Sequence, residues 1–194
     1  PGLPNKEFEG KSSMGQYGDM VMELDHRTGQ VLDALKAAGV EENTIVIWLS
    51  DNGPVHMQTP GLSDYMGSSA GPFRGEVGDV LEGSLRVPAI IKWPGHIKPG
   101  VSNEMVSVHD FFPTLANIIG AEVPKDRPID GVDYSPFFTG KTNTAARESV
   151  INFLGDEIAA VRWKNYRFYP KTIIPSSGNP SMHGVGAYRV ENMG

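Results

Sequence analysis

The stretch that decides the fold is residues 44–53, which read Thr-Ile-Val-Ile-Trp-Leu-Ser-Asp-Asn-Gly. The part from Thr44 to Ser50 is short, β-branched and apolar on both faces. Such a run is typical of a strand buried on both sides, as in a parallel sheet covered by helices. Ligands collect at the carboxyl ends of strands in open α/β sheets. The side chains of Asp51 and Asn52, directly after the strand, are therefore candidates for a functional site.

A long helix is predicted upstream of this strand. Apolar or large residues recur at nearly helical spacing from Met14 to Ala38. Ser12 or Ser13 is placed to cap the start of the helix, and Gly39 is placed to end it. A helix that leads into a buried strand indicates an α/β layered fold.

Downstream, Gly, Pro and Ser are frequent over residues 54–84, which predicts a long loop of a length that is usually functional or disordered. Residues 86–93 predict a second strand, with Pro88 near its start. Asp110 is expected to cap a helix that ends at Ile119.

From residue 149 the pattern changes to short strand-like runs, with Lys164-Asn165 as a plausible hairpin turn. We therefore predict two parts: an α/β core over residues 1–145, and a small antiparallel α+β unit over residues 146–194. The tryptophans at positions 48, 93 and 163 fall on strand-like runs and are expected in the core.

Composition excludes several classes of protein. The chain has 194 residues and a net charge of −6, which argues against a nucleic-acid partner. No apolar run approaches the roughly 20 residues that span a bilayer. Cysteine is absent, which excludes disulfides and thiolate zinc sites and leaves the redox compartment open. No signal-peptide pattern is visible at the start, and the localisation stays unknown.

The pair Asp51 and Asn52 offers a carboxylate and an amide oxygen side by side, which suits a hard cation such as calcium or magnesium. Gly53 allows the backbone to turn away sharply after them. The same three residues also fit an ordinary Asn-Gly turn. The triplet alone leaves both readings open.

A series of short segments in a fixed order adds context. Upstream stand Gly-Lys-Ser at 10–12, Tyr-Gly-Asp at 17–19 and Glu-Leu-Asp at 23–25. From the strand onward come Asp-Asn-Gly-Pro at 51–54, Gly-Pro-Phe-Arg-Gly-Glu at 71–76, Glu-Gly-Ser-Leu-Arg-Val-Pro at 82–88, Trp-Pro-Gly-His-Ile-Lys-Pro-Gly at 93–100, Asp-Phe-Phe-Pro-Thr-Leu at 110–115 and Asp-Gly-Val-Asp at 130–133. This string resembles the sulfatase family, and bacterial arylsulfatases in particular.

The resemblance implies an alkaline-phosphatase-like α/β core, with a mostly parallel sheet, followed by a smaller C-terminal sheet. Members of the family hydrolyse sulfate esters with a divalent cation, usually calcium, and a formylglycine made from a Cys or Ser in a Cys/Ser-x-Pro-x-Arg motif. By resemblance, Asp51 and Asn52 are metal ligands. The family is often periplasmic, secreted or lysosomal.

The chain departs from the family pattern in its catalytic groups. It contains no Cys and no Ser-x-Pro-x-Arg, so no formylglycine can form. In the family, that motif, two further metal aspartates and a substrate histidine lie upstream of the segments present here. We therefore expect a C-terminal portion of a sulfatase that is inactive by itself and holds its cation weakly or not at all.

Three more positions concern the substrate. Val77 occupies the place where the family usually has a lysine that contacts sulfate, and valine cannot donate a charge-assisted hydrogen bond. His56, on the rim loop, and Arg74 are candidate substrate-binding residues. An exposed loop position for His56 and a structural ion pair for Arg74 are the competing readings.

Two alternatives to an inactive sulfatase portion remain. The first is a non-catalytic binding protein, in which exposed sheet edges promote self-association or pairing with a partner. The second is a phosphatase or phosphodiesterase of the same superfamily, since the fold alone does not separate these activities from sulfatases.

Overall fold

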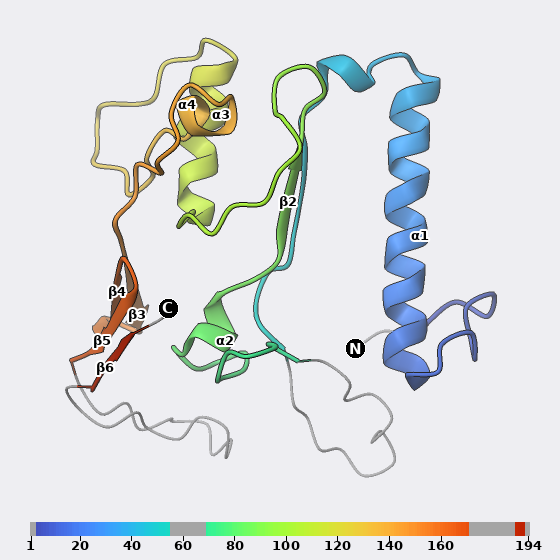
Figure 1. The fold of residues 1–194 in the computed structure, drawn as a ribbon, viewed down its shortest axis with the longest axis horizontal. Helices are drawn as coiled ribbons and strands as arrows, with labels where there is room; N and C mark the ends of the chain where they lie inside the picture. Colours follow the sequence, from blue (N-terminus) through green and yellow to red (C-terminus); the bar gives the residue numbers. More distant parts are fainter. Residues whose placement is uncertain (1–2, 55–68, 171–188, 193–194) are drawn as a thin grey trace. The chain divides into compact units, whose positions relative to one another are not determined.

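The computed structural model describes residues 3–54, 69–170 and 189–192 (Figure 1). The described residues divide into two compact units, the first formed by residues 3–54 and 69–94 and the second by residues 95–170 and 189–192. The predicted boundary near residue 145, between an α/β core and a small antiparallel unit, stays a prediction.

The first unit begins with helix α1, Gly15–Ala37, followed by a short 3-10 helix η1, Glu41–Asn43. The buried carboxylate of Asp19 accepts the backbone N–H groups of Gly10 at 2.8 Å and Ser12 at 2.7 Å, which fixes the turn before the helix. Gly39 has φ +68° and ends the helix as predicted. The prediction of a serine cap is wrong, because the N-cap residue is Met14 and no side chain caps it.

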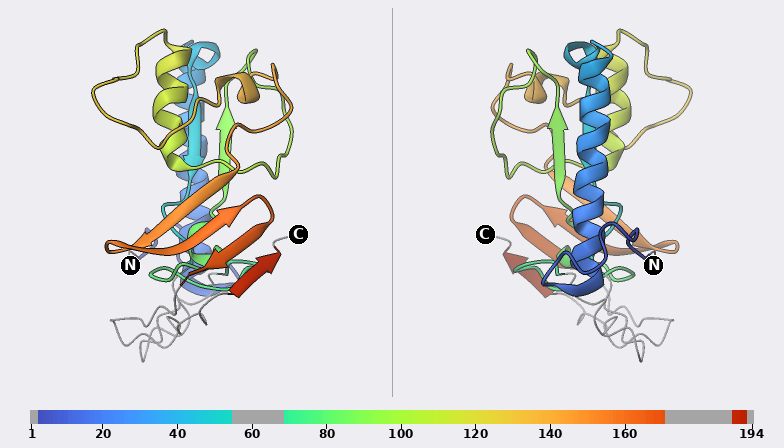
Figure 2. Two further views of the ribbon diagram at one scale, coloured as in Figure 1. Left: turned by 90° about the vertical axis from the view of Figure 1, so that its left-hand side faces the viewer. Right: turned by 90° about the vertical axis from the view of Figure 1, so that its right-hand side faces the viewer.

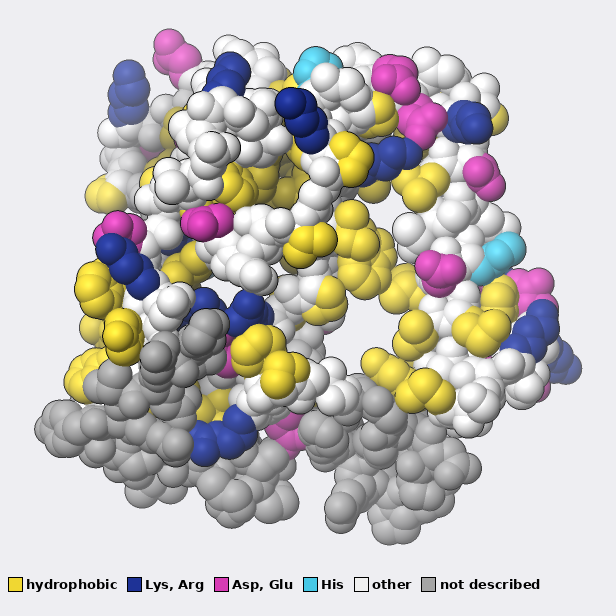
Figure 3. All heavy atoms as spheres, in the orientation of Figure 1, with side chains coloured by type: hydrophobic (Ala, Val, Ile, Leu, Met, Phe, Trp, Pro, Cys, Tyr) yellow, Lys and Arg dark blue, Asp and Glu magenta, His cyan; other side chains and the backbone are white. Residues whose placement is uncertain are grey.

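Much of the apolar surface of α1 is exposed. Val21, Leu24 and Val31 are 47%, 51% and 58% exposed, and yellow side chains lie along the helix in Figure 3. Across residues 3–54, 69–170 and 189–192 we find no helix with the length and apolar character needed to cross a membrane.

Strands β1, Val46–Leu49, and β2, Ala89–Lys92, form a two-stranded sheet (Figure 1). They are antiparallel, with Ile47 opposite Ile91 and Trp48 opposite Ile90. The parallel pairing expected of this strand is therefore not present among the described strands. An apolar run specifies burial and not direction, so it does not distinguish the two kinds of ladder. The expectation that β1 is buried on both faces is also wrong, because its residues are half-buried or exposed.

A short helix α2, Glu82–Leu85, packs against the corner that follows β1. The N–H of Gly53 donates to the carbonyl of Ser84 at 2.7 Å, and the N–H of Gly83 donates to the carbonyl of Arg74 at 2.8 Å. A Cβ atom on Gly53 would overlap the carbonyl oxygen of Gly83, and one on Gly83 would lie 2.6 Å from the carbonyl oxygen of Gly75. Glycine at these positions lets three backbone segments meet.

The second unit contains a 3-10 helix η3, Val108–Asp110, and helices α3, Phe111–Ile118, and α4, Ser135–Phe138. Asp110 stands at the start of α3 as predicted, but its side chain does not cap that helix. It forms a capping box with Ser107 around η3 instead. Gly120 has φ +71° after the end of α3.

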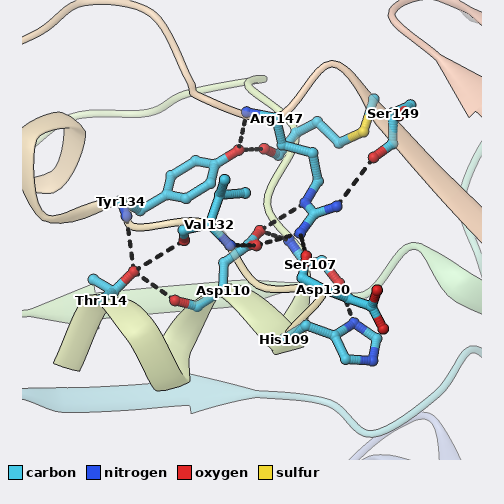
Figure 4. Close-up of polar contacts among 10 residues, drawn as sticks. Ser107, His109, Asp110, Thr114, Asp130, Val132, Tyr134, Arg147 and Ser149 are labelled. Carbon is cyan, nitrogen blue, oxygen red and sulfur yellow. Dashed lines mark hydrogen bonds and ion pairs between the residues drawn. The ribbon is translucent and has the colours of Figure 1, made fainter. Parts of the chain in front are cut away.

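The fully buried carboxylate of Asp110 is paired with Arg147, whose side chain is 13% exposed (Figure 4). Arg147 Nε lies 2.9 Å from Asp110 Oδ2, and Arg147 Nη2 also donates to Asp110 Oδ1. The same carboxylate also accepts the backbone N–H groups of Val132, at 2.8 Å, and Ser107, at 2.7 Å. Burial by itself would raise the pKa of Asp110, but the hydrogen bonds from Arg147 and these N–H groups hold that pKa below its ordinary value of 3.8.

Tyr134 extends this network. Its buried ring places the hydroxyl where it donates to the carbonyl of Met105 and accepts the backbone N–H of Arg147 at 3.1 Å. Burial raises the pKa of the phenol. Thr114 Oγ1 accepts the N–H of Tyr134 at 2.8 Å, so α3, the segment around Tyr134 and the approach to the next strand are tied together.

The remaining strands form an antiparallel sheet in the order β3-β4-β5-β6 (Figure 2): β3 is Ser149–Leu154, β4 Glu157–Trp163, β5 Tyr166–Tyr169 and β6 Arg189–Asn192. The predicted hairpin turn is confirmed, since Trp163 pairs with Tyr166 and Lys164 has φ 51°. Trp163 is 51% exposed, so its predicted place in the core is wrong. Trp48 and Trp93 are half-buried.

Replacing Gly53 with alanine is expected to destabilise the chain by about 2 kcal/mol, because the new methyl group must displace the backbone of Gly83. Thermal unfolding followed by circular dichroism measures the change. Gly29→Ala in α1 is the matched control: nothing lies within 4 Å of its Cβ position, and alanine there should stabilise by about 0.5–1 kcal/mol. Equal effects of the two substitutions would contradict the packing described above.

Replacing Asp110 with asparagine should lower the free energy of unfolding by about 3 kcal/mol, because the largely buried guanidinium of Arg147 loses the carboxylate that pairs with it. Since the folded pKa of Asp110 is depressed, its contribution is present above the unfolded pKa, near 3.8, and is lost as the pH falls through the folded pKa. Urea unfolding between pH 7 and pH 3 should therefore show a steeper acid loss in the parent chain than in the Asp110→Asn variant.

The control for that experiment is Asp126→Asn, which removes the carboxylate of an ion pair whose side chains, Asp126 and Arg127, are 60% and 74% exposed. Solvent screens this pair, so little change in stability is expected. A loss as large as that of Asp110→Asn would mean that the charge change alone, and not burial, determines the effect.

Candidate functional site

The corner formed by Asp51 and Asn52 comes two residues after the end of β1. Asp51 is exposed, and its Oδ1 accepts the N–H of Asn52 at 2.9 Å. Asn52 is half-buried, and its Nδ2 donates to the carbonyl of Gly53 at 2.8 Å. Ser50 Oγ donates to the carbonyl of Asn52 at 3.1 Å. The corner lies at the carboxyl end of its strand as predicted, but with β2 antiparallel beside it.

Backbone hydrogen bonds hold a second segment against this corner. Besides the bond from Gly53 to Ser84, the N–H of Val77 donates to the carbonyl of Pro54 at 2.8 Å. Val77 is half-buried. Val77, which stands where the resemblance predicts a lysine, is thus hydrogen-bonded to Pro54, two residues after Asn52. Val77 and Pro54 are distant in sequence.

The loop that carries Val77 is shaped by Asp79. Its carboxylate accepts the backbone N–H groups of Glu76 at 2.9 Å and Leu81 at 2.7 Å. Gly75, at φ +110°, makes the bend before Glu76. Sequence reasoning missed these contacts, and the signal that was available is Asp79 among the three glycines at positions 75, 78 and 83.

Arg74 has an exposed side chain, and its carbonyl accepts the N–H of Gly83. Arg74 therefore belongs to the same hydrogen-bonded segment as Val77. The binding of substrate by the Arg74 side chain stays a prediction. Arg86 lies over the ring of Phe73, with its guanidinium carbon 4.4 Å from the ring centroid. His56, the other predicted substrate residue, lies outside the described residues.

The donor set fits part of a hard-cation site. A carboxylate and an amide carbonyl oxygen are ligands that calcium and magnesium accept. Among the described residues, no group of three or more His, Cys, Asp or Glu side chains is arranged to hold a metal ion. Calcium takes about 6–8 oxygens. Two side chains such as Asp51 and Asn52 can offer only a minority of the oxygens that such an ion takes.

Comparisons with known proteins agree on one family. The Sulfatase family model matches residues 2–121. Mouse steryl-sulfatase is 41% identical over 160 residues, which cover 81% of this chain and 26% of that protein. Human arylsulfatase A is 37% identical over 163 residues, which cover 83% of this chain and 31% of that protein. The chain thus spans less than a third of the length of these relatives.

Solved structures agree. PsFucS1 sulfatase from Pseudoalteromonas sp. superposes with a TM-score of 0.82 at 28% identity, covering 98% of this chain and 39% of that one. A Bacteroides thetaiotaomicron sulfatase, described in the context of glycosaminoglycan metabolism, also gives a TM-score of 0.82, at 27% identity. The predicted α/β fold class of the alkaline-phosphatase type is confirmed by these neighbours. The chain belongs to the sulfatase family.

Proposed function

We propose that this chain is the C-terminal part of a sulfuric ester hydrolase of the arylsulfatase type, and that it contributes one wall of the active site without the nucleophile. The observation that carries the proposal is the pair of hydrogen bonds from Gly53 to Ser84 and from Val77 to Pro54. Together these bonds hold the Asp51-Asn52 corner beside the segment from Arg74 to Val77.

In the complete protein, Asp51 and Asn52 would supply two oxygen ligands to calcium or magnesium. The cation would add positive charge where a sulfate ester gains negative charge in the transition state. The hydrogen bonds of this chain orient the ligands: Asn52 Nδ2 is turned to the carbonyl of Gly53, which leaves the amide oxygen on the opposite side of the group. With two ligands, we expect weak or absent binding in this chain alone.

The valine at position 77 would limit the hydrolysis of sulfate esters by the complete protein. A lysine at this position would bring a charged donor next to the corner, whereas valine offers only an apolar side chain. Losing a donor that stabilises developing negative charge typically costs about 3 kcal/mol in the transition state. We therefore propose that the complete protein is a weak sulfatase, or one with an altered substrate preference.

The isolated chain should show no turnover of an aromatic sulfate ester such as 4-nitrophenyl sulfate in the presence of calcium. It has no Cys and no Ser-x-Pro-x-Arg from which a formylglycine is made. Release of nitrophenol, with human arylsulfatase A as the positive control, measures this directly. Turnover above background would contradict the proposal. Hydrolysis of 4-nitrophenyl phosphate in a parallel assay would favour the phosphatase alternative.

The importance of position 77 can be tested in a chimaera in which this chain replaces the matching part of human arylsulfatase A. Val77→Lys should raise kcat/KM for a sulfate ester about 100-fold, because it restores a charged donor beside the corner. Val40→Lys, at an exposed position just before η1, adds the same charge away from the corner and should change little. An unchanged rate for Val77→Lys would show that another cation already serves the substrate.

A further inference from the structure

Asn52 and Gly53 form the one Asn-Gly pair in the chain of 194 residues. An asparagine followed by glycine is prone to lose its side-chain amide, because glycine has no Cβ atom to hinder its own backbone nitrogen from reaching the preceding side chain. The same pair makes the corner after β1, so the fold decides whether the two groups can react.

The reaction needs only the chain and water. The backbone nitrogen of Gly53 gives up its proton and bonds to Cγ of Asn52, while the bond from Cγ to Nδ2 breaks and ammonia leaves with the proton. Water then opens the cyclic imide at either of its carbonyl groups. One product is aspartate at position 52, and the other is isoaspartate, whose main chain is longer by a methylene carbon.

The closed corner holds the reacting nitrogen in another contact. The N–H of Gly53 donates to the carbonyl of Ser84 at 2.7 Å, and Ser84 is buried. Removing that proton would leave a negative nitrogen facing the carbonyl oxygen of Ser84, and the repulsion opposes the attack. The side chain of Asn52 is also held, because its Nδ2 donates to the carbonyl of Gly53 at 2.8 Å.

The isoaspartate product does not fit the closed corner. A Cβ atom on Gly53 would lie only 1.9 Å from the carbonyl oxygen of Gly83, so the backbone of Gly53 has no room to move toward α2. An added main-chain carbon before Gly53 would displace its N–H from the carbonyl of Ser84. A corner that has opened and formed isoaspartate therefore cannot close again in the same way.

We propose that Asn52 is a conditional modification site, which keeps its amide while the hydrogen bond from Gly53 to Ser84 is closed and deamidates when that contact opens. Segments of a folded chain open locally at a lower cost than global unfolding. The packing of α2 against the corner thus controls the chemical lifetime of the Asn52 side chain. This inference does not depend on the proposed function, because the reaction involves no substrate and no cation.

The test compares the deamidation rate of Asn52 in the folded chain and in the chain unfolded by urea, in the same mildly alkaline buffer. Peptide mapping by mass spectrometry measures the conversion of amide to acid, and protein isoaspartate methyltransferase labels the isoaspartate. The folded chain should react about tenfold or more slowly, because opening a buried hydrogen bond has a cost of that order. Equal rates in the two states would overturn the proposal.

Gly83→Ala tests whether the contact itself gives the protection. The new Cβ atom would lie 2.6 Å from the carbonyl oxygen of Gly75 and should push α2 away from the corner. Deamidation of Asn52 in this variant should be about fivefold faster than in the parent chain under folding conditions. An unchanged rate in a folded Gly83→Ala chain would show that the contact does not protect Asn52.

Asp110→Asn is the matched control, because it removes a buried ion pair in the second unit and leaves the contacts of the corner intact. It should keep the parent rate. Equal acceleration by both variants would mean that global unfolding limits the reaction, and would overturn the proposal. If Gly83→Ala does not fold, amide hydrogen exchange in the parent chain decides: the N–H of Gly53 should exchange more slowly than that of exposed Asn103, and equally fast exchange would contradict a closed corner.

Discussion

The backbone of Gly53 lies so close to the carbonyl group of Gly83 that no side chain fits between them. Everything proposed for the site depends on this approach. It allows the N–H of Gly53 to reach Ser84 and the N–H of Val77 to reach Pro54, so the end of β1 and the loop before α2 form one structure. Because backbone atoms make these contacts, the site geometry tolerates varied side chains at its neighbours but not at the glycines themselves.

The second unit is organised by a buried charge. Two charges taken out of water are costly unless each is satisfied, and Asp110 is satisfied by Arg147 and by two backbone N–H groups. The backbone of Arg147 is also held in place, because its N–H donates a hydrogen bond to the hydroxyl of Tyr134. The network joins α3 to the residues just before β3, so the helical segment and the small sheet are linked by polar contacts.

Both units leave apolar surface exposed, along α1 and on one face of the β3–β6 sheet. Matched relatives are three to four times longer than the aligned segment, which accounts for 26% to 31% of their length. A two-stranded sheet and a helix with an exposed apolar side are the expected result when the described residues form only part of a layered fold.

The sequence by itself determined the family, the long first helix, the positions of β1 and β2, the hairpin at Lys164 and the stop at Gly39. These follow from local periodicity, from turn chemistry and from motifs that are contiguous along the chain. Tertiary structure decided the antiparallel pairing of β1 with β2, the exposure of Trp163, the contact of Val77 with Pro54 and the partner of Asp110. Each of those depends on a residue distant in sequence, and an apolar run or a lone aspartate carries no information about which distant group will meet it.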